Sequence, residues 1–323
     1  RSVPPEKRAK LLAAGGAGLV MTEATGVVPE GRISPLCPGI WSDELAGAWR
    51  PIVDYAHGQG AVMGIQLAHA GRKASTAAPF DGGGYVDPSL GGWQPVGPSA
   101  VAFDALPVPT ALSVDDIDAL VDAFAAAARR ARLAGFDVIE LHAAHGYLMH
   151  QFLSPLANAR DDLYGGSLEN RMRFPVAVAA AVRAAWPEDR PLFVRISTTD
   201  WTPGGWDLEQ SVVLAGRLRD AGVDLIDASS GGLHHEQRIP DVVTYQTDLA
   251  AELRRRAGLP VAGVGRVTDS RQADALIRDG DVDAVFLARQ LLRDPHWPLR
   301  AAHELGTKGR WPKQYLRAAS WRS

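Results

Sequence analysis

The chain has 323 residues, 46% of them hydrophobic and 22% charged, and its 34 Lys and Arg against 37 Asp and Glu give a formal charge of −3. This balance argues against nucleic acid or an anionic membrane as the main partner, and no apolar stretch reaches the ~18 residues of a membrane span. A single cysteine, Cys37, excludes disulfides within the chain and iron–sulfur clusters held by several of its thiolates. The first residues carry no apolar signal-peptide core, so we expect a cytoplasmic protein with neither a nucleic-acid nor a membrane partner.

A short sequence motif recurs along the chain. It consists of a small residue, Gly, an apolar residue, Asp and an aliphatic run. It reads AGFDVIEL at 134–141, AGVDLIDA at 221–228 and, more loosely, DGDVDAVFLA at 279–288. The first two copies follow segments with helical periodicity, 114–133 and 208–221. A helix, then Gly, then a strand, repeated, indicates βα units around a parallel sheet.

Capping residues bound the two helical segments. Ser113 precedes the first and Gly135 follows it, and Asp207 and Gln210 have the spacing of a capping box at the start of the second. The same reasoning places strands at 17–25, 61–67, 136–142, 191–197, 223–229, 261–265 and 284–288.

Seven strands in βα units predict a TIM (β/α)8 barrel in which only the second to eighth strands are recognisable. An open doubly wound sheet would need a G-x-G-x-x-G loop after its first strand, and the sequence has none there. We therefore expect a barrel lacking its opening strand, with residues 1–323 forming a single domain. Two features lie outside the βα units: a long capping loop at about 72–112, rich in Gly and Pro, and a C-terminal tail at about 307–323.

Alternation along a strand assigns a face to each polar side chain. In three of the expected strands the aliphatic residues must cover the outer face, which turns Gln66, Glu140, His142 and Arg195 inward. Three of these lie near the ends of successive strands, where barrels build binding sites, and they favour a planar polar ligand. Two structural alternatives remain: Glu140 could simply pair with Arg195, and Gln66 could be a satisfied core amide.

Two histidines and a tyrosine follow one of these strands, in the string HAAHGY. His142, His145 and Tyr147 come directly after an inward-facing strand end, where packing alone hardly explains them. The sequence therefore predicts catalytic residues. The histidine pair could instead bind a metal, but a third ligand is not evident, and we predict no metal site.

Several long segments carry a family resemblance. They are GFDVIELHAAHGYLMHQFLSPLANARDDLYGGSLENR (135–171), GLVMTEATGVVPEGRISP (18–35), GIQLAHAGRKAS (64–75), FVRISTTDWTPGGWDLE (193–209), SSGGL (229–233) and LLRDP (291–295). Together they resemble the old yellow enzyme family of FMN-dependent ene-reductases. The ending QYLR at 314–317 is most similar to its thermophilic-like bacterial subclass. The resemblance covers nearly the whole chain.

The resemblance implies that FMN lies across the barrel mouth. Residues matching its FMN contacts are Ala24, Gln66, Arg195, Gly232, Gly263, Val264, Gly265, Ala288 and Arg289. The loops after the last two strands are the usual phosphate site of such barrels, which fits the glycines at 263–265 and the charge of Arg289. Arg195 is then expected to stabilise the negative charge of the reduced flavin, with Gln66 hydrogen-bonding the same edge.

The resemblance also implies a reaction in two halves. NADPH or NADH reduces FMN, which then transfers hydride to the β-carbon of an electron-poor alkene such as an α,β-unsaturated carbonyl compound. His142 and His145 match the pair that binds the carbonyl oxygen, and Tyr147 matches the acid that protonates the α-carbon. Arg317 matches an arginine that enters the substrate site of a neighbouring subunit, so we expect a homodimer or homotetramer.

The sequence departs from the family at its N-terminus, where the first strand and its loop have no counterpart before Gly15. We expect either a sequence that starts late or a natural fragment, with two open sheet edges and weakened FMN binding. Ala288 also stands where the family commonly has Gly, and Cys37 is interpreted as a structural free thiol.

Two other functions are open. One is a related FMN barrel enzyme, such as a 2,4-dienoyl-CoA reductase or an amine dehydrogenase, which the single cysteine disfavours because those relatives carry a four-cysteine cluster site. The other is a degenerate or truncated barrel without flavin activity, acting as a binding or silent fragment.

Overall fold

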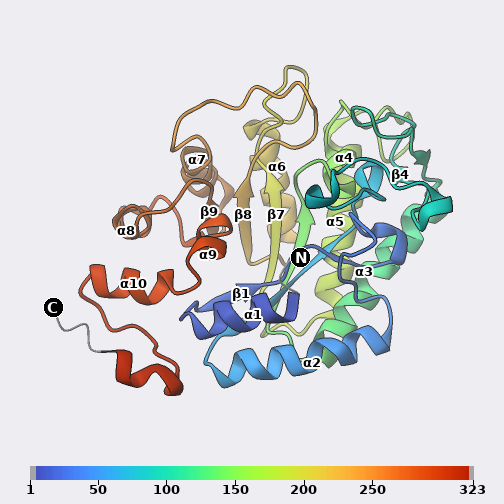
Figure 1. The fold of residues 1–323 in the computed structure, drawn as a ribbon. Helices are drawn as coiled ribbons and strands as arrows, with labels where there is room; N and C mark the ends of the chain where they lie inside the picture. The colour runs from blue at the N-terminus through green and yellow to red at the C-terminus, as the bar shows by residue number, and fades with distance from the viewer. Residues whose placement is uncertain (1–4, 320–323) are drawn as a thin grey trace.

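A curled parallel sheet forms the centre of the computed structural model, which describes residues 5–319 (Figure 1). Its strands are β1 (Leu19–Met21), β2 (Thr25–Gly26), β3 (Val62–Ala68), β6 (Val138–Ala143), β7 (Leu192–Ser197), β8 (Leu225–Ser229), β9 (Val261–Val264) and β10 (Ala284–Phe286). They pair in the order β1-β3-β6-β7-β8-β9-β10, always in parallel, and β2 pairs with the end of β3. The predicted barrel of seven strand positions is confirmed.

The helices cover the outside of this sheet (Figure 1). They are α1 (Pro5–Ala14), α2 (Asp43–Gly58), α3 (Val114–Ala134), α4 (Leu148–Leu153), α5 (Leu168–Ala185), α6 (Leu208–Asp220), α7 (Thr247–Ala257), α8 (Ser270–Arg278), α9 (Arg289–Arg293) and α10 (Trp297–Glu304). Aliphatic residues on the outer face of the sheet, such as Ile139 and Val194, are buried beneath them, as are Ile117 and Phe124 of α3. The core is therefore the layer between sheet and helices, and the inward face of the strands is left for polar side chains.

The caps predicted from sequence are formed, one of them only in part. Ser113 and Asp116 make a complete capping box at the start of α3, and Gly135 ends that helix in a left-handed conformation with φ 93°. Asp207 accepts a hydrogen bond from the Gln210 N–H, but the Gln210 side chain donates to a carbonyl upstream of Asp207. The second capping box is thus half formed.

The strand predicted at 17–25 is wrong as a single element. The chain leaves the sheet after β1, and Thr22 accepts a hydrogen bond from the Gln66 N–H with its side chain before β2 resumes pairing with β3. The break spans residues 22–24, so Ala24 lies in a connection rather than in a strand. A polar hydroxyl that can replace a ladder partner is the physical reason for the interruption.

The two outer strands have one neighbour each. Within residues 5–319, β1 pairs only with β3, and β10 pairs only with β9. The residues of β1 and β10 are mostly half-buried, whereas those of β6 and β8 are buried. Near this opening the end of α1 touches the connection from α9 to α10. A Cβ placed on Gly15 would lie 1.7 Å from the carbonyl oxygen of Pro295.

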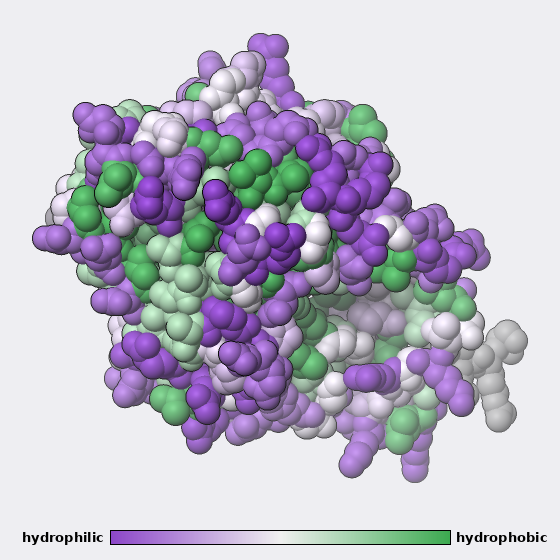
Figure 2. All heavy atoms as spheres, turned by 180° about the vertical axis from the view of Figure 1, so that it is seen from behind, coloured by the Kyte–Doolittle hydropathy of each residue, from purple (hydrophilic) through white to green (hydrophobic). Residues whose placement is uncertain are grey.

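The region predicted as a capping loop contains only short elements. They are the 3-10 turns η2 (Gly71–Lys73), η3 (Pro79–Asp81) and η4 (Pro88–Leu90) and the paired strands β4 (Val96–Gly97) and β5 (Thr110–Ala111), while η1 (Pro29–Gly31) precedes them. The predicted tail carries η5 (Lys313–Ala318) and borders a recess of about 540 Å³ next to α10, and Figure 2 shows the rear face hollowed beside this segment. Residues 320–323 of that tail lie outside the described residues. None of the described helices is long and apolar enough to cross a membrane.

Candidate active site

Two adjoining cavities open at the C-terminal end of the sheet. The inner one, of about 270 Å³, lies beside the opening between β1 and β10, and the outer one, of about 410 Å³, lies over the ends of β8, β9 and β10. They share the lining residues Arg195, Val264, Phe286, Leu287 and Ala288, so they form one continuous site. The carboxyl ends of parallel barrel strands are where such folds place binding sites.

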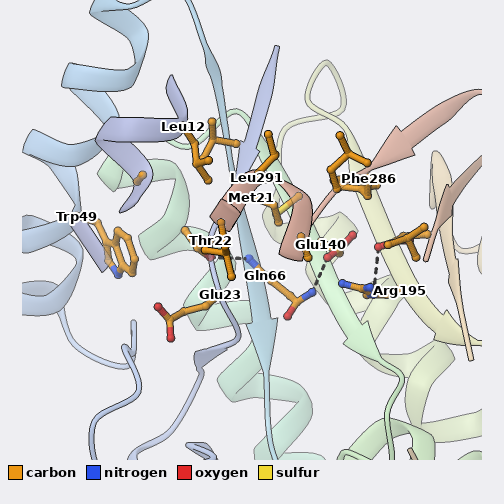
Figure 3. Close-up of a pocket in the computed structure, with 17 residues that line it drawn as sticks. Leu12, Met21, Thr22, Glu23, Trp49, Gln66, Glu140, Arg195, Phe286 and Leu291 are labelled. Carbon is orange, nitrogen blue, oxygen red and sulfur yellow. Dashed lines mark hydrogen bonds and ion pairs between the residues drawn. The ribbon is translucent and has the colours of Figure 1, made fainter. Parts of the chain in front are cut away.

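A row of polar side chains from four strands lines the inner cavity (Figure 3). Gln66 donates from Nε2 to Oε1 of Glu140 at 2.6 Å, and Arg195 Nε forms an ion pair with Oδ2 of Asp227 at 3.2 Å. The prediction from strand alternation that Gln66, Glu140 and Arg195 point inward is therefore correct. The alternative in which Arg195 pairs directly with Glu140 is not what the structure shows, because the register of β7 and β8 places Asp227 opposite Arg195.

The two histidines and the tyrosine come together at the rim. The rings of His142 and Tyr147 are 4.9 Å apart, those of His142 and His145 are 5.1 Å apart, and both pairs meet edge to face. His142 accepts the Ala144 N–H at Nδ1, so its proton lies on Nε2, 3.4 Å from Nδ1 of His145. The other nitrogen of His145 lies 2.7 Å from the hydroxyl of Ser229.

The protonation states of this cluster follow from its burial. Burial, with Arg195 as a further cause, holds the pKa of His142 well below its usual range, and burial and His142 do the same to the pKa of His145. Burial raises the pKa of Tyr147 to about 12, and Cys37 nearby adds to the shift. At neutral pH the site thus presents two neutral imidazoles and a protonated phenol, all of which can donate a hydrogen bond.

The side chains of Lys73 and His150 hold the turn that carries these residues. His145 has φ 59° and Gly146 has φ 73°, an unusual left-handed pair. Lys73 donates from Nζ to the carbonyl oxygens of His145 and Gly232, both at 2.9 Å, and the Gly146 N–H donates to Nδ1 of the buried His150 at 2.9 Å. Burial, followed by the charge of Arg72, lowers the pKa of Lys73 to about 8. The turn after β6 is thereby tied to the loop after β8.

We predict that the Gly146→Ala substitution destabilises the protein more than Gly166→Ala does. Both glycines have φ 73°, so both substitutions carry the ~1–2 kcal/mol cost of a left-handed alanine. A Cβ on Gly146 would lie 2.3 Å from the carbonyl oxygen of Gly232, whereas one on Gly166 meets nothing within 4 Å. The extra cost at Gly146 should be about 1–3 kcal/mol. Urea unfolding of both variants measures it, and equal losses would show that the close approach does not matter.

A third cavity, of about 830 Å³, lies on the other side of Tyr147. Lys73, Tyr147 and Cys37 line it together with residues 76–80, 82–84 and 103–106 of the region predicted as a capping loop. The phenol of Tyr147 is therefore reachable from a space large enough for a small organic molecule, while its ring packs against His142.

The structure brings most of the predicted site residues together. Gln66, Arg195, His145, Val264, Gly265, Ala288 and Arg289 line the two adjoining cavities, and Tyr147 lines the third. Ala24, His142, Gly232 and Gly263 are not among the lining residues, and His142 joins the cluster through its ring contacts with His145 and Tyr147. A Cβ on Gly263 would point at Val282 under the sheet, at 3.0 Å, so that position needs a small residue for packing. Arg317 lies exposed in η5, and its entry into a neighbouring subunit stays a prediction.

Sequence reasoning missed several residues of the site, among them Lys73, Asp227, Ser229 and Gln246. Strand parity applied to 223–229 would have found Asp227 and Ser229, since both alternate with the buried Ile226 and Ala228. Gln246 donates to the Val264 carbonyl and accepts from the Ser230 hydroxyl, contacts that only the tertiary structure reveals.

Comparison with known proteins assigns the family. The model of the NADH:flavin oxidoreductase / NADH oxidase family matches residues 8–308. The chain belongs to this family. It is 45% identical over 311 residues to an NADPH dehydrogenase of Geobacillus thermodenitrificans, covering 96% of this chain and 86% of that protein. The old yellow enzyme resemblance seen in the sequence is therefore confirmed.

Solved structures agree with this assignment. The chain is similar to the old yellow enzyme homologue from Zymomonas mobilis, with a TM-score of 0.77 and 30% identity over 98% of this chain and 89% of that one. It is also similar to morphinone reductase in complex with tetrahydroNAD, with a TM-score of 0.76 and 30% identity over 95% and 84% of the two chains. The chain is thus an FMN-dependent oxidoreductase with the barrel of its family.

The residues of the NADH:flavin oxidoreductase site fit FMN chemically. Arg195 offers hydrogen-bond donors and Gln66 an amide at the inner end of the site, as the polar edge of an isoalloxazine requires. Arg266, Arg289 and Arg293 line the outer cavity and suit a phosphate. Gly265 has φ 106°, and a Cβ there would lie 2.8 Å from Nε2 of Gln246, so its backbone is open only because no side chain is present.

Proposed function

We propose that the chain is an NAD(P)H-dependent ene-reductase acting on electron-poor alkenes. The observation that carries this proposal is the group of two neutral imidazoles and one protonated phenol packed together at the barrel rim beside Arg195. The relatives named NADPH dehydrogenase and the tetrahydroNAD complex of morphinone reductase support the choice of a nicotinamide nucleotide as reductant.

The proposed FMN contacts follow the two cavities. Gln66 and Arg195 would bind the pyrimidine edge, while Arg289 and the backbone of Val264 and Gly265 would bind the phosphate, with Gly263 next to them in the chain although it lines neither cavity. Ala24, Gly232 and Ala288 complete the proposed set. Bound FMN would supply hydride storage, accepting a hydride from NADPH or NADH and giving it to the β-carbon of the alkene.

The chain's own residues would polarise the alkene and protonate it. His142 and His145 are neutral and can donate N–H groups to a carbonyl oxygen as it gains negative charge. In the structure the His142 proton faces His145 instead, so a carbonyl oxygen would take the place of His145 as acceptor. Tyr147 keeps its proton through neutral pH and would deliver it to the α-carbon.

A three-step titration tests this function. The purified protein should be yellow and should release FMN on denaturation. Anaerobic NADPH should bleach the flavin absorbance, and 2-cyclohexenone should then restore it with formation of cyclohexanone. Added cyclohexanone is the matched control and should restore nothing, because it has no activated double bond. A colourless protein that takes up no added FMN would instead favour the flavin-free barrel.

A further inference from the structure

Two buried carboxyl groups in the inner cavity are only half satisfied. Glu140 and Asp227 are each 1% exposed. Oε1 of Glu140 accepts from Gln66, and Oδ2 of Asp227 pairs with Arg195. The remaining oxygens, Oε2 of Glu140 and Oδ1 of Asp227, have no hydrogen-bond donor among the described residues. Buried polar atoms left in this way point to a missing partner.

A single proton would satisfy both atoms. Glu140 on β6 and Asp227 on β8 lie on the two strands that pair with β7, with Asp227 directly opposite Arg195, and their carboxyl groups are close enough to hydrogen-bond each other. If both were ionised, Arg195 would face two negative charges in a buried site, which is unfavourable. One proton on Oε2 of Glu140 can be donated to Oδ1 of Asp227, and it leaves one negative charge to balance Arg195.

The surroundings of the pair favour this state. Of the charged and titratable groups among the described residues, Arg195 from β7 and Glu23 from the connection after β1 line the same cavity, and Arg195 interacts with both carboxyl groups. Burial, followed by the charge of Asp227, raises the pKa of Glu140 to about 8. Burial also raises the pKa of Asp227, although Arg195 opposes the shift.

We propose that Glu140 and Asp227 share one proton and act as positioning residues for the flavin edge. The charge kept by Asp227 holds Arg195, and the neutral Glu140 fixes the amide of Gln66 with its Nε2 turned inward, which leaves Oε1 of Gln66 free to accept a hydrogen bond from a ligand. The role assigned to the pair rests on the proposed placement of FMN, whereas the shared proton itself does not.

Flavin affinity as a function of pH tests the positioning role. Above about pH 8 the wild-type pair should lose its proton, and the FMN affinity of the apoprotein should fall by up to ~10-fold per pH unit, the limit for one linked proton. Glu140→Gln mimics the protonated acid, because its amide can accept from Gln66 and donate to Asp227. It should bind FMN within ~3-fold of wild type at pH 7 and show no alkaline loss up to pH 9.

Asp227→Asn is the contrasting variant. It removes the charge that faces Arg195, so its affinity should be at least ~10-fold lower over the whole pH range. A Glu140→Gln variant that keeps the alkaline loss of wild type, or an Asp227→Asn variant that binds as tightly as wild type, would overturn the positioning role.

Infrared spectroscopy of the wild-type apoprotein tests the shared proton without flavin and without a variant. Labelling with ¹³C-glutamate should shift a protonated-carboxyl C=O band that persists at pH 7, far above the ordinary pKa of ~4.3 for Glu. Absence of that band would contradict the proposal even if FMN binds. Presence of the band without any FMN binding would refute the flavin function and the positioning role, and leave the shared proton standing.

The pH dependence of apoprotein stability also tests the shared proton independently of flavin binding. The folded chain keeps a proton that the unfolded chain loses at its ordinary pKa, so the free energy of unfolding should fall as pH rises from about 4.5 to about 8. In Glu140→Gln this contribution should be missing, and identical slopes in the two proteins would contradict the shared proton.

Discussion

Replacing Tyr147 with Phe should slow reoxidation of the reduced enzyme by an alkene ~10²–10⁴-fold, the range expected for loss of a general acid. The hydroxyl is the only atom removed, and its elevated pKa makes it a proton donor throughout the neutral range. Reduction by NADPH needs no proton from this group, so its rate should change less than ~3-fold. Stopped-flow absorbance under anaerobic conditions measures the two half-reactions separately.

A second acceptor sharpens the Tyr147 experiment. Benzoquinone needs no carbon protonation, so it should reoxidise Tyr147→Phe about as fast as wild type, whereas 2-cyclohexenone should not. A parallel drop in both half-reactions, or with both acceptors, would show that the phenol packs the site rather than supplying a proton. The ring contact with His142 at 4.9 Å makes that packing role the main competing explanation.

The His150→Ala substitution should destabilise the protein by ~3–5 kcal/mol, because it removes the imidazole that pairs with one oxygen of the buried Asp200 carboxylate, whose other oxygen accepts from Ser154 and from the Trp206 N–H. Nε2 of His150 lies 2.8 Å from Oδ1 of Asp200, and both side chains are 0% exposed. The same imidazole accepts the Gly146 N–H, which would also lose its partner. Because Gly146 adjoins His145, substrate affinity should fall along with stability.

The His57–Asp137 pair is the matched control for His150. It joins the same two residue types at 2.7 Å, but its side chains are 40% and 34% exposed. His57→Ala should therefore cost less than ~1 kcal/mol. Urea titration of the flavin-bound protein, followed by circular dichroism, compares the two. Similar losses in both variants would mean that burial does not set the strength of these pairs.

Much of the site could be predicted from strand periodicity alone. Aliphatic residues on one face of β3, β6 and β7 predict that Gln66, His142 and Arg195 point inward. The structure places Gln66 and Arg195 on the inner cavity and His142 opposite Arg195 in the strand register. Periodicity works here because a parallel strand covered by helices has only one face available for polar groups. The order of strands in a barrel then brings those groups to one rim.

The pairing within the site could not be predicted in this way. The alternation of residues along a strand predicts that Glu140 and Arg195 both face inward. It does not predict which carboxylate pairs with Arg195, because the pairing with Asp227 depends on strand register and side-chain conformation. The break between β1 and β2 could not be predicted either, because it depends on the hydroxyl of Thr22, which accepts an amide hydrogen bond from the adjacent strand. A side chain that takes the place of a backbone acceptor leaves no periodic pattern in the sequence.

The contacts of Lys73 have a consequence for ligand recognition. One ammonium group joins the segments that follow β6 and β8, so their relative position is established during folding and not at each encounter with a small molecule. The entropy of ordering these loops is then absent from the binding free energy, and a ligand with few atoms can be held by few contacts. Affinity for compact molecules of differing skeleton is the expected result, since recognition depends on a fixed frame rather than on enclosure.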